Sequence, residues 1–305
     1  MEPAAWLWIP ITIAAAFAQT LRNAGQRLLV PDLGTLGATL VRFLYGLPFA
    51  TAWLIGVLAV THTGLPAPNA RFALFVTGGA ICQMLATALL LRAMMERNFT
   101  LGIAYSKSEI IQVALIGFVL LGDPVSAVLA VAIGCATLGV LFLSPADPRR
   151  PIRAFLTGWT TRPALMGIAA GTGFALAGVG YRGASLSLTD TSFVVAAAST
   201  LVCAQLLQTA LLGGWLGIFR PRTAIRVLNV RRLPVFVGLM GAMASVGWFT
   251  AMAIESVAHV YTLGLIELLF SYVISRRLFR EHLTRLELSG MLLLGLGLVI
   301  VALER

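Results

Sequence analysis

The residues best placed for chemistry lie between Ala104 and Gln112, inside an apolar run from Phe99 to Leu121. Lys107 and Glu109 stand two positions apart there, and Lys107 is the only lysine in the chain. Each charge costs roughly 3 kcal/mol at the centre of a membrane helix. Such groups are retained where they bind a substrate or coupling ion, or where they form a buried structural ion pair. We favour the binding interpretation, because arginine serves at every other basic position and is not equivalent to a compact ammonium group.

On a regular helix this stretch separates into two faces. One face collects Tyr105, Ser106, Ser108, Glu109 and Gln112, and Lys107 points the opposite way. Residues two positions apart on a helix do not face each other. We therefore expect that Lys107 and Glu109 do not neutralise each other, and that each finds a partner on another helix, in a ligand or in trapped water.

Further polar residues recur at helical spacing in other apolar segments. Gln19, Arg22, Asn23 and Gln26 form one stripe, Gln83 and Thr87 a second, and Glu267, Ser271 and Ser275 a third. Stripes of this kind cannot face lipid cheaply, so we expect them to line an interior cavity. For any single Gln or Ser the alternative is a hydrogen bond between helices, and for Arg22 it is extension to the membrane interface.

The predicted substrate-binding set combines these residues with one aromatic side chain. It comprises Lys107, Glu109, Tyr105, Ser108, Gln112, Gln19, Asn23, Gln83, Glu267, Ser271 and Trp248. Glu109 and Glu267 are also the candidates for coupling to an ion. We expect no catalytic residue and no metal ligand, because the three cysteines and the histidines lack metal-site spacing. The chain has no Gly-x4-Gly-Lys-Ser/Thr motif, so no ATP motor and no cofactor is expected.

The composition places these residues in a membrane protein. Of the 305 residues, 59% are hydrophobic and 11% charged, and the mean hydropathy is +0.92. Values of this kind are typical of an integral membrane protein. The net charge of +10 would indicate nucleic-acid binding in a soluble protein. Here the arginines cluster between apolar segments, which is typical of cytoplasmic loops beside an anionic leaflet.

The apolar segments predict ten membrane-spanning helices of about 20 residues each. They cover residues 5–29, 35–60, 71–95, 99–121, 124–144, 163–185, 191–216, 233–255, 259–279 and 285–303. The longest connection contains Pro145, Pro148 and Pro151. It divides the chain into an N-terminal five-helix repeat (1–146), a basic connecting loop (147–162) and a C-terminal five-helix repeat (163–305).

The two halves have the features of an inverted repeat around a central cavity. Glu109 and Glu267 are 158 residues apart, and so are Asp123 and Glu281. A duplicated half with five helices must be inverted, so equivalent loops face opposite sides and should differ in charge. The loops after the seventh and ninth helices are rich in arginine, whereas those after the second and fourth are not. All basic loops then face the cytoplasm, and both termini are predicted to be periplasmic.

This organisation resembles the drug/metabolite transporter superfamily in its bacterial EamA-type branch. Besides the ten helices, the similarity rests on an Arg-Phe pair and on a recurring acidic residue, short turn and Gly-bearing helix. The residues concerned are Arg42-Phe43, Leu121–Ser126 with Gly134, and Phe279–Thr284 with Gly290. The resemblance implies a central cavity, alternating access, and small metabolites, amino acids or amphipathic compounds as cargo. Many family members have a proline where Glu109 and Glu267 stand here, and they are often drawn with cytoplasmic termini.

We expect a secondary transporter, an exporter or exchanger, that moves a small polar metabolite such as an amino acid across a bacterial inner membrane. Lys107 and polar groups of the predicted helix 5–29 would meet an anionic moiety, and Glu109 and Glu267 would meet an amine or carry a proton. The expected partners are a small-molecule substrate, the lipid bilayer and protons, in a monomer or weak homodimer without nucleic acid.

Three alternatives remain open. The chain could export amphipathic cationic drugs, using the two carboxylates without Lys107. It could instead be a membrane-embedded enzyme acting on a lipid-linked substrate, although no His/Asp or His/Glu cluster at metal spacing supports that activity. A channel is the third alternative, and charges at the membrane midplane favour a gated site over an open pore. We therefore do not expect an enzyme.

Overall fold

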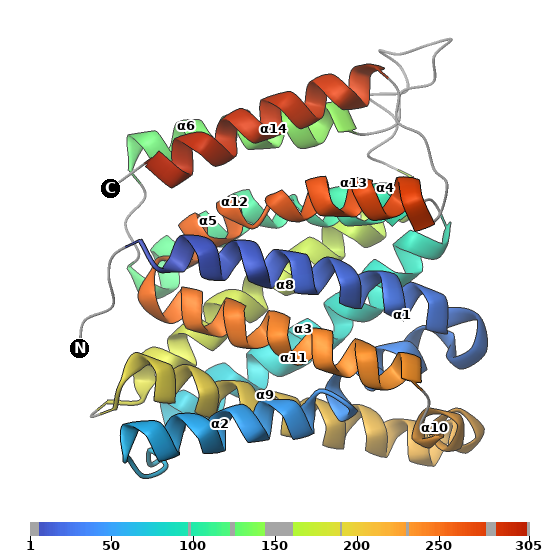
Figure 1. Ribbon diagram of the computed structural model, residues 1–305, viewed down its shortest axis with the longest axis vertical. Coiled ribbons are helices and arrows are strands. Elements are labelled where there is room, and N and C mark those ends of the chain that lie inside the picture. The colour runs from blue at the N-terminus through green and yellow to red at the C-terminus, as the bar shows by residue number, and fades with distance from the viewer. Residues whose placement is uncertain are drawn as a thin grey trace.

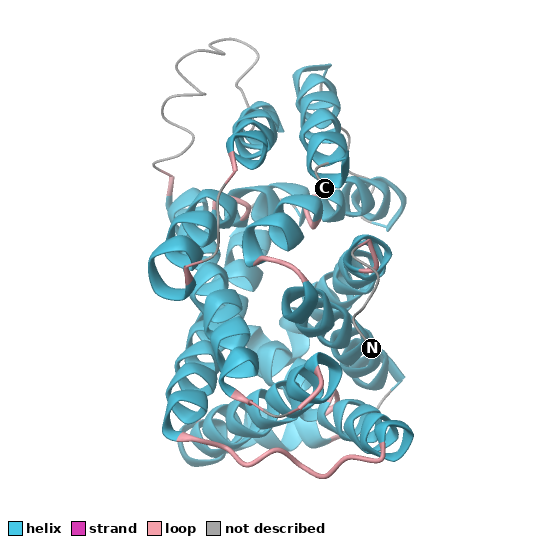
Figure 2. Ribbon diagram, turned by 90° about the vertical axis from the view of Figure 1, so that its left-hand side faces the viewer, coloured by secondary structure: helices cyan, strands magenta, loops and turns pink. Residues whose placement is uncertain are grey.

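The computed structural model describes residues 6–96, 99–122, 126–143, 161–189, 191–229, 232–278 and 285–303. Within these ranges every regular element is an α-helix and no strand occurs (Figure 2). The helices are α1 (Trp8–Leu44), α2 (Leu47–Thr61), α3 (Ala70–Glu96), α4 (Phe99–Ser106), α5 (Glu109–Leu121), α6 (Ala127–Leu143), α8 (Arg162–Ser187), α9 (Phe193–Phe219), α10 (Pro221–Leu228), α11 (Arg232–Ile254), α12 (Val257–Leu263), α13 (Ile266–Leu278) and α14 (Arg285–Leu303).

The helices have the length and composition of membrane-spanning segments. Six helical stretches of the described residues are long and apolar enough to cross a membrane. Large apolar side chains such as Leu74 and Ile218 are 73% and 74% exposed on the outside. A helix satisfies its own backbone hydrogen bonds where no water is available, and aliphatic faces are favourable in lipid. These features agree with the prediction of an all-α membrane protein.

Charge is distributed unevenly between the two ends of the helices. The start of α1 and the end of α14 lie at one end, on the left in Figure 1. The opposite end carries exposed arginines of α10 and of the last turn of α13: Arg222, Arg226, Arg276 and Arg277. The short amphipathic helix α10 was not predicted from the sequence. The basic ends of α10 and α13 thus lie on the same side of the bundle. Which side of a membrane this end faces stays a prediction.

Several predicted features lie outside the described residues. Most of the basic connecting loop (147–162) is among them, since the description resumes at Thr161. Asp123 and Glu281, the acidic residues of the two recurring turns, are also outside. The boundary between the two predicted repeats therefore stays a prediction.

The first two predicted helices meet at a turn centred on Gly34. The helical run from Trp8 to Leu44 is interrupted at Gly34, which has a φ of 67° and a ψ of 171°. This backbone conformation is essentially restricted to glycine. After a second interruption at Tyr45 and Gly46 the chain continues as α2. The two predicted segments, 5–29 and 35–60, are thus present, with the polypeptide reversing between them.

The predicted helix 99–121 is wrong as a continuous element. The chain forms α4 up to Ser106 and starts α5 at Glu109, with Lys107 in the turn between them. The turn is closed by the Ser108 backbone N–H, which donates to the Tyr105 carbonyl at 3.5 Å. The Ser108 hydroxyl donates to the same carbonyl at 3.1 Å. Side-chain hydroxyls that satisfy backbone carbonyls in this way offer the chain an alternative to the regular helix.

The predicted helix 259–279 is interrupted in the same way. α12 ends at Leu263 and α13 begins at Ile266. The Leu265 N–H donates to the Thr262 carbonyl at 3.2 Å, and the Glu267 N–H donates to the Gly264 carbonyl at 3.0 Å. These tightened turns redirect the chain without a proline. Both acidic residues of the predicted site, Glu109 and Glu267, therefore stand in the first turn of a new helix.

The helices associate in pairs that link the two halves of the chain. α3 packs along α8, α1 packs along α11, and α6 packs along α14 (Figure 1). The interrupted helices cross one another, so that α4 contacts α13 and α5 contacts α12. α8 contacts both α4 and α5 and covers the first interruption.

Two glycines of α8 bring it against this interruption. A Cβ on Gly167 would collide with the Tyr105 side chain, and a Cβ on Gly171 would lie 2.5 Å from the Ser106 carbonyl oxygen. Gly167 and Gly171 therefore permit the close approach of α8 to the turn at Lys107.

A polar cluster closes the connection between α11 and α12, at the end of the helices away from α10. Glu255 accepts hydrogen bonds from the Ser256 backbone N–H at 2.7 Å and lies 3.2 Å from His259 Nδ1. Arg182 of α8 donates to the Glu255 carbonyl at 2.7 Å. Burial alone would raise the pKa of Glu255, but the hydrogen bonds from His259 and Ser256 and the nearby positive charges hold it below its usual range.

Candidate functional site

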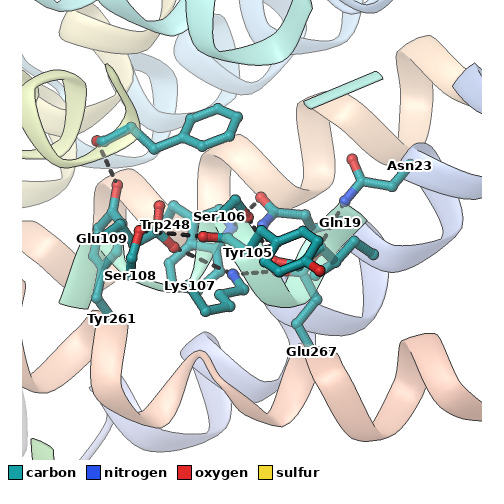
Figure 3. A network of polar contacts seen from close by, with 12 residues as sticks. Gln19, Asn23, Tyr105, Ser106, Lys107, Ser108, Glu109, Trp248, Tyr261 and Glu267 are labelled. Atoms are coloured by element: carbon teal, nitrogen blue, oxygen red, sulfur yellow. Dashed lines mark hydrogen bonds and ion pairs between the residues drawn. The ribbon is translucent and has the colours of Figure 1, made fainter. Parts of the chain in front are cut away.

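The centre of the protein is an ion triad formed by Lys107, Glu109 and Glu267. Lys107 Nζ donates to Glu267 Oε2 at 2.7 Å and to Glu109 Oε1 at 3.2 Å (Figure 3). The three residues are 7%, 4% and 1% exposed. The expectation that Lys107 and Glu109 do not neutralise each other is wrong. It assumed an unbroken helix, and the turn at Lys107 removes the angular separation that such a helix imposes.

Glu267 is the residue on which several helices converge. Its Oε2 also accepts a hydrogen bond from Gln19 Nε2 at 2.8 Å, and its Oε1 accepts one from Asn23 Nδ2 at 2.8 Å. Trp248 Nε1 donates to Gln19 Oε1 at 2.9 Å and so fixes the orientation of that amide. The carboxylate of this α13 residue is thereby held by side chains from α1 and from the interruption between α4 and α5. Hydrogen bonds and a paired charge are what allow an ionised group to be buried.

Two arginines lie beside the triad. Arg22 is 2% exposed and donates from Nε and Nη2 to Asn23 Oδ1 at 3.2 and 2.7 Å. Its burial excludes the alternative that this side chain extends to the membrane interface. Arg42 is 4% exposed and donates from Nη1 to Thr87 Oγ1 at 3.0 Å. Among the described residues, the partners found for these two guanidinium groups are neutral oxygens.

A second hydrogen-bonded group lies next to Arg42. Gln83 Oε1 accepts from Tyr181 OH at 3.0 Å and from Gln208 Nε2 at 2.8 Å. Gln208 Nε2 also donates to Tyr181 OH at 3.0 Å. Thr87, the partner of Arg42, donates its hydroxyl to the Gln83 carbonyl at 2.8 Å. These contacts join α3, α8 and α9 into one polar layer behind the triad.

The polar groups surround a central cavity of about 40 Å³. It is lined by Gln19, Arg22, Arg42, Gln83, Leu90, Ser106, Lys107, Glu109, Phe174, Tyr181, Ser245, Trp248, Phe249, Met252, Tyr261 and Glu267. A cavity of this size has room for a few water molecules, given that one water needs roughly 10–15 Å³ by this kind of measure. Part of the lining is aromatic and comprises Phe174, Tyr181, Trp248, Phe249 and Tyr261.

Most of the predicted set meets at this cavity. Lys107, Glu109, Gln19, Gln83, Glu267 and Trp248 line it. Asn23 lies one contact behind, bridging Glu267 and Arg22.

Besides Asn23, four further predicted residues are outside the cavity wall. Tyr105 packs against Gly167 of α8, and the Ser108 hydroxyl is used in the turn. Gln112 is half-buried on α5. Ser271 is buried one turn after Glu267, and its hydroxyl has no hydrogen-bond partner in the part of the chain that the structure describes. The prediction used an unbroken helix over 99–121, and the interruption at Lys107 places Tyr105 and Ser108 outside the cavity. Gln112 and Ser271 lie about one turn after the two carboxylates on α5 and α13, beyond the cavity lining.

Other lining residues were not predicted as site residues. For Arg42 the available signal is a charged side chain within an apolar segment, the same signal that identifies Lys107. Tyr181, Phe174, Phe249 and Met252 carry no comparable signal, because aromatic and Met side chains are equally expected in any apolar core.

Within the described ranges, no group of three or more His, Cys, Asp or Glu residues could hold a metal ion. The arrangement of Lys107, the two carboxylates and the two arginines is suited to binding small polar groups by charge-assisted hydrogen bonds.

Comparison with known proteins adds the fold but no activity. No protein-family model matches the chain, and no curated protein matches it. A solved structure described only as the crystal structure of a protein is 14% identical to this chain and has a TM-score of 0.67. The match covers 99% of each chain. At this identity the likeness supports a shared fold over the whole length and says nothing of what either protein binds.

Proposed function

We propose that this chain is a secondary transporter of the drug/metabolite transporter type, which moves a small zwitterionic metabolite such as an amino acid by alternating access. The observation that carries the proposal is the buried triad of Lys107, Glu109 and Glu267 at two helix interruptions that cross inside an apolar bundle. Interrupted helices at the centre of a bundle supply substrate and coupling-ion sites in many transporters. Intramembrane charges that face a cavity mark such pathways.

The helix pairs support ten spans arranged as two inverted halves. If the second half repeats the first, α1 corresponds to α8 and α3 corresponds to α11. Under this correspondence, packing of α3 against α8 in one half-to-half contact implies packing of α11 against α1 in the equivalent contact. Both pairs are present. The pair of α6 and α14 converts into itself, and so does the crossing of α4 and α5 with α13 and α12. Two halves related in this way can exchange conformations and open to opposite sides in turn.

The small cavity is consistent with a closed conformation between the two open ones. About 40 Å³ is too little room for an amino acid, so substrate entry requires α4, α5, α12 and α13 to separate on one side. Their contacts include the ion pair of Lys107 with Glu267, which links the two interruptions. Substrate groups that compete with Lys107 for its carboxylate partners would weaken this ion pair and so couple binding to the separation of the helices, because a ligand shifts an equilibrium through its differential contacts.

Proton coupling belongs to the same proposal. A carboxylate that loses Lys107 during the cycle becomes an unpaired buried charge, and protonation is the least costly way to neutralise it. Glu267 is the better candidate than Glu109, because its ion pair with Lys107 links the two interruptions and breaks when they separate, whereas Glu109 and Lys107 belong to the same interruption. We also propose the bacterial inner membrane as the location, with the basic ends in the cytoplasm and both termini periplasmic.

A second candidate function is export of amphipathic cations. The aromatic wall formed by Trp248, Tyr261, Phe174 and Phe249 favours it, because aromatic faces attract organic cations. Both carboxylates are nevertheless bound to Lys107, and two arginines stand beside them. A monovalent cation would enter a site that already has more positive than negative groups, which favours the zwitterion.

The first experiment identifies a ligand. Purified protein in detergent is heated in the presence of single amino acids, nucleosides, sugars and quaternary amines. A ligand that binds only the folded protein raises the melting temperature. A zwitterionic amino acid is the expected hit. If quaternary amines alone raise the melting temperature, the second candidate function replaces the first.

The second experiment measures transport. In proteoliposomes loaded with the hit compound, the protein should catalyse exchange of labelled for unlabelled substrate. Lys107→Ala and Lys107→Arg should both abolish exchange, because the compact ammonium group is needed between the two carboxylates. Arg92→Ala is the matched control. Arg92 is exposed, does not line the cavity, and pairs with Glu96 through an Nε–Oε1 distance of 3.6 Å. Exchange at the parent rate by Lys107→Ala would refute a role of the triad in transport.

A further inference from the structure

The charged groups in the cavity wall do not balance. Three positively charged side chains, Lys107, Arg22 and Arg42, and two carboxylates, Glu109 and Glu267, line the cavity among the described residues. Lys107 contacts both carboxylates, at 2.7 and 3.2 Å. The two guanidinium groups are left with an amide oxygen and a hydroxyl oxygen as their hydrogen-bond acceptors. One positive charge is therefore in excess on the arginine side.

The two arginines are held next to each other by the helix that faces them. A Cβ on Gly241 of α11 would lie 3.3 Å from Arg22 Cδ and 3.3 Å from Arg42 Cγ. Both aliphatic stems thus lie across this one glycine. Arg22 reaches it from the part of α1 before the interruption at Gly34, and Arg42 from the part after it. Ser245, one helical turn after Gly241, also lines the cavity. Like charges placed side by side in an apolar interior are unfavourable unless an anion is shared between them.

One guanidinium nitrogen is also left over. Arg22 Nη1 is buried and has no hydrogen-bond partner among the described residues, although the side chain borders the cavity. A charged donor that is buried without a partner costs free energy, and native proteins keep few of them without a reason. The donor, the excess charge and the adjacent cavity all indicate a missing negative group.

We propose that Arg22 and Arg42 form an anion subsite that takes the carboxylate group of the ligand. The subsite rests on the proposed function only in that the carboxylate belongs to the transported compound. Guanidinium groups match the two oxygens of a carboxylate in plane and spacing. A carboxylate carries one negative charge and neutralises the excess of one, whereas a doubly charged phosphate would reverse it.

This assignment changes the role expected for Lys107. The sequence predicts that Lys107 binds the anionic moiety of the substrate, but both carboxylates of the protein already occupy its ammonium group. The anion then binds to the arginines, and an amino group of the same ligand competes with Lys107 for Glu109, its longer contact at 3.2 Å. The two ends of a zwitterion would lie on the two sides of one small cavity.

The test measures binding of acetate, the smallest organic carboxylate that fits the argument. The full-length protein in detergent is melted while sodium acetate replaces sodium chloride at constant ionic strength, and acetamide serves as the neutral probe of the same shape. The melting temperature of the parent should rise with acetate and saturate, and acetamide should have no saturable effect. Arg22→Gln and Arg42→Gln should raise the acetate concentration at half-effect by roughly tenfold or more, as expected for lost hydrogen bonds to a charged group.

Arg71→Gln is the matched control, because Arg71 is exposed at the start of α3 and stacks on Phe75. It should keep the parent response. If the Gln variants do not fold, Arg22→Lys and Arg42→Lys retain the charge but lose the forked donor geometry, and they should show a weaker acetate response. The proposal is overturned by the absence of a saturable acetate response. It is equally overturned if the arginine variants retain the parent half-effect concentration.

The binding test and the transport test fail independently. An acetate response that depends on both arginines, without exchange of any zwitterion in proteoliposomes, would refute the transport proposal and leave the anion subsite standing. Exchange of an amino acid at the parent rate and affinity by Arg42→Gln would refute the subsite and leave the transport proposal standing.

Discussion

Replacement of Lys107 by methionine tests how the buried triad is held together. Methionine keeps an unbranched side chain of similar length and removes only the ammonium group. Glu109 and Glu267 then remain buried side by side without their shared cation. Gln19 and Asn23 still donate to Glu267, so this carboxylate is left partly satisfied.

The magnitude follows from the two distances. With an effective dielectric constant of 20, Coulomb attraction is roughly 6 kcal/mol at 2.7 Å and roughly 5 kcal/mol at 3.2 Å. The net loss is smaller, because the carboxylates can take up protons when the cation is gone. Removing one partner of a buried ion pair costs about 3–5 kcal/mol in practice. At about 2 °C per kcal/mol for a chain of this size, the melting temperature should fall by about 6–10 °C.

The assay is thermal unfolding of purified protein in detergent, applied to a double-mutant cycle. Lys107→Met and Glu267→Gln are each measured alone and then together. Because the two side chains interact directly, the two single losses in unfolding free energy should not add. The loss of the double variant should be smaller than their sum by at least about 1.5 kcal/mol. Glu96→Gln is the control, since Glu96 pairs with Arg92 and Arg162 only at the surface, at 3.6 and 3.7 Å. It should change stability by less than about 1 kcal/mol.

Two results would refute this reasoning. One is a melting temperature of Lys107→Met within the range of the Glu96→Gln control, which would mean that the triad contributes no more than a surface pair. The other is additivity of the two single losses, which would mean that Lys107 and Glu267 act on stability separately.

Three further predictions concern packing, coupling and pH. Gly171→Ala should destabilise the protein by about 1–3 kcal/mol, because its Cβ would lie 2.5 Å from the Ser106 carbonyl oxygen, whereas Gly56→Ala, with no described atom within 4 Å, should leave the melting temperature unchanged or raise it. In proteoliposomes with an imposed pH gradient and no membrane potential, Glu267→Gln should exchange substrate but lose the response to the gradient; a variant that keeps the full response would exclude Glu267 as the coupling group. The pKa of Glu255 is lowered in the folded protein, so its stabilising contribution is complete above its ordinary pKa and is lost as pH falls through the folded value. Glu255→Gln should therefore lower the melting temperature at pH 7 and have progressively less effect below about pH 4.5. A difference in melting temperature that is constant with pH would contradict this.

The sequence by itself determined the apolar helices and the identity of the buried charges. Hydrophobic segments of about 20 residues predict spans because the thickness of a bilayer sets their length. The bounds of α3 and α9 accordingly lie within a few residues of the predicted 71–95 and 191–216. Lys107 and Glu267 were recognisable because a charge is costly in an apolar segment unless it points inward. This cost depends on the residues that neighbour the charge along the chain, and these can be read from a single sequence.

Only the tertiary structure decided how these charges are paired. Local geometry excluded contact between Lys107 and Glu109, and the exclusion held only for an unbroken helix. The interruption between α4 and α5 is stabilised by the Ser108 hydroxyl and by the glycine face of α8, which lies more than fifty residues away in the chain. The pairing of Lys107 with Glu267 spans 160 residues. The burial of Arg22 similarly depends on Gly241 of another helix. Periodicity assigns a side chain to a face of its own helix, but its partner depends on which helix packs there, and that is a property of the assembled bundle.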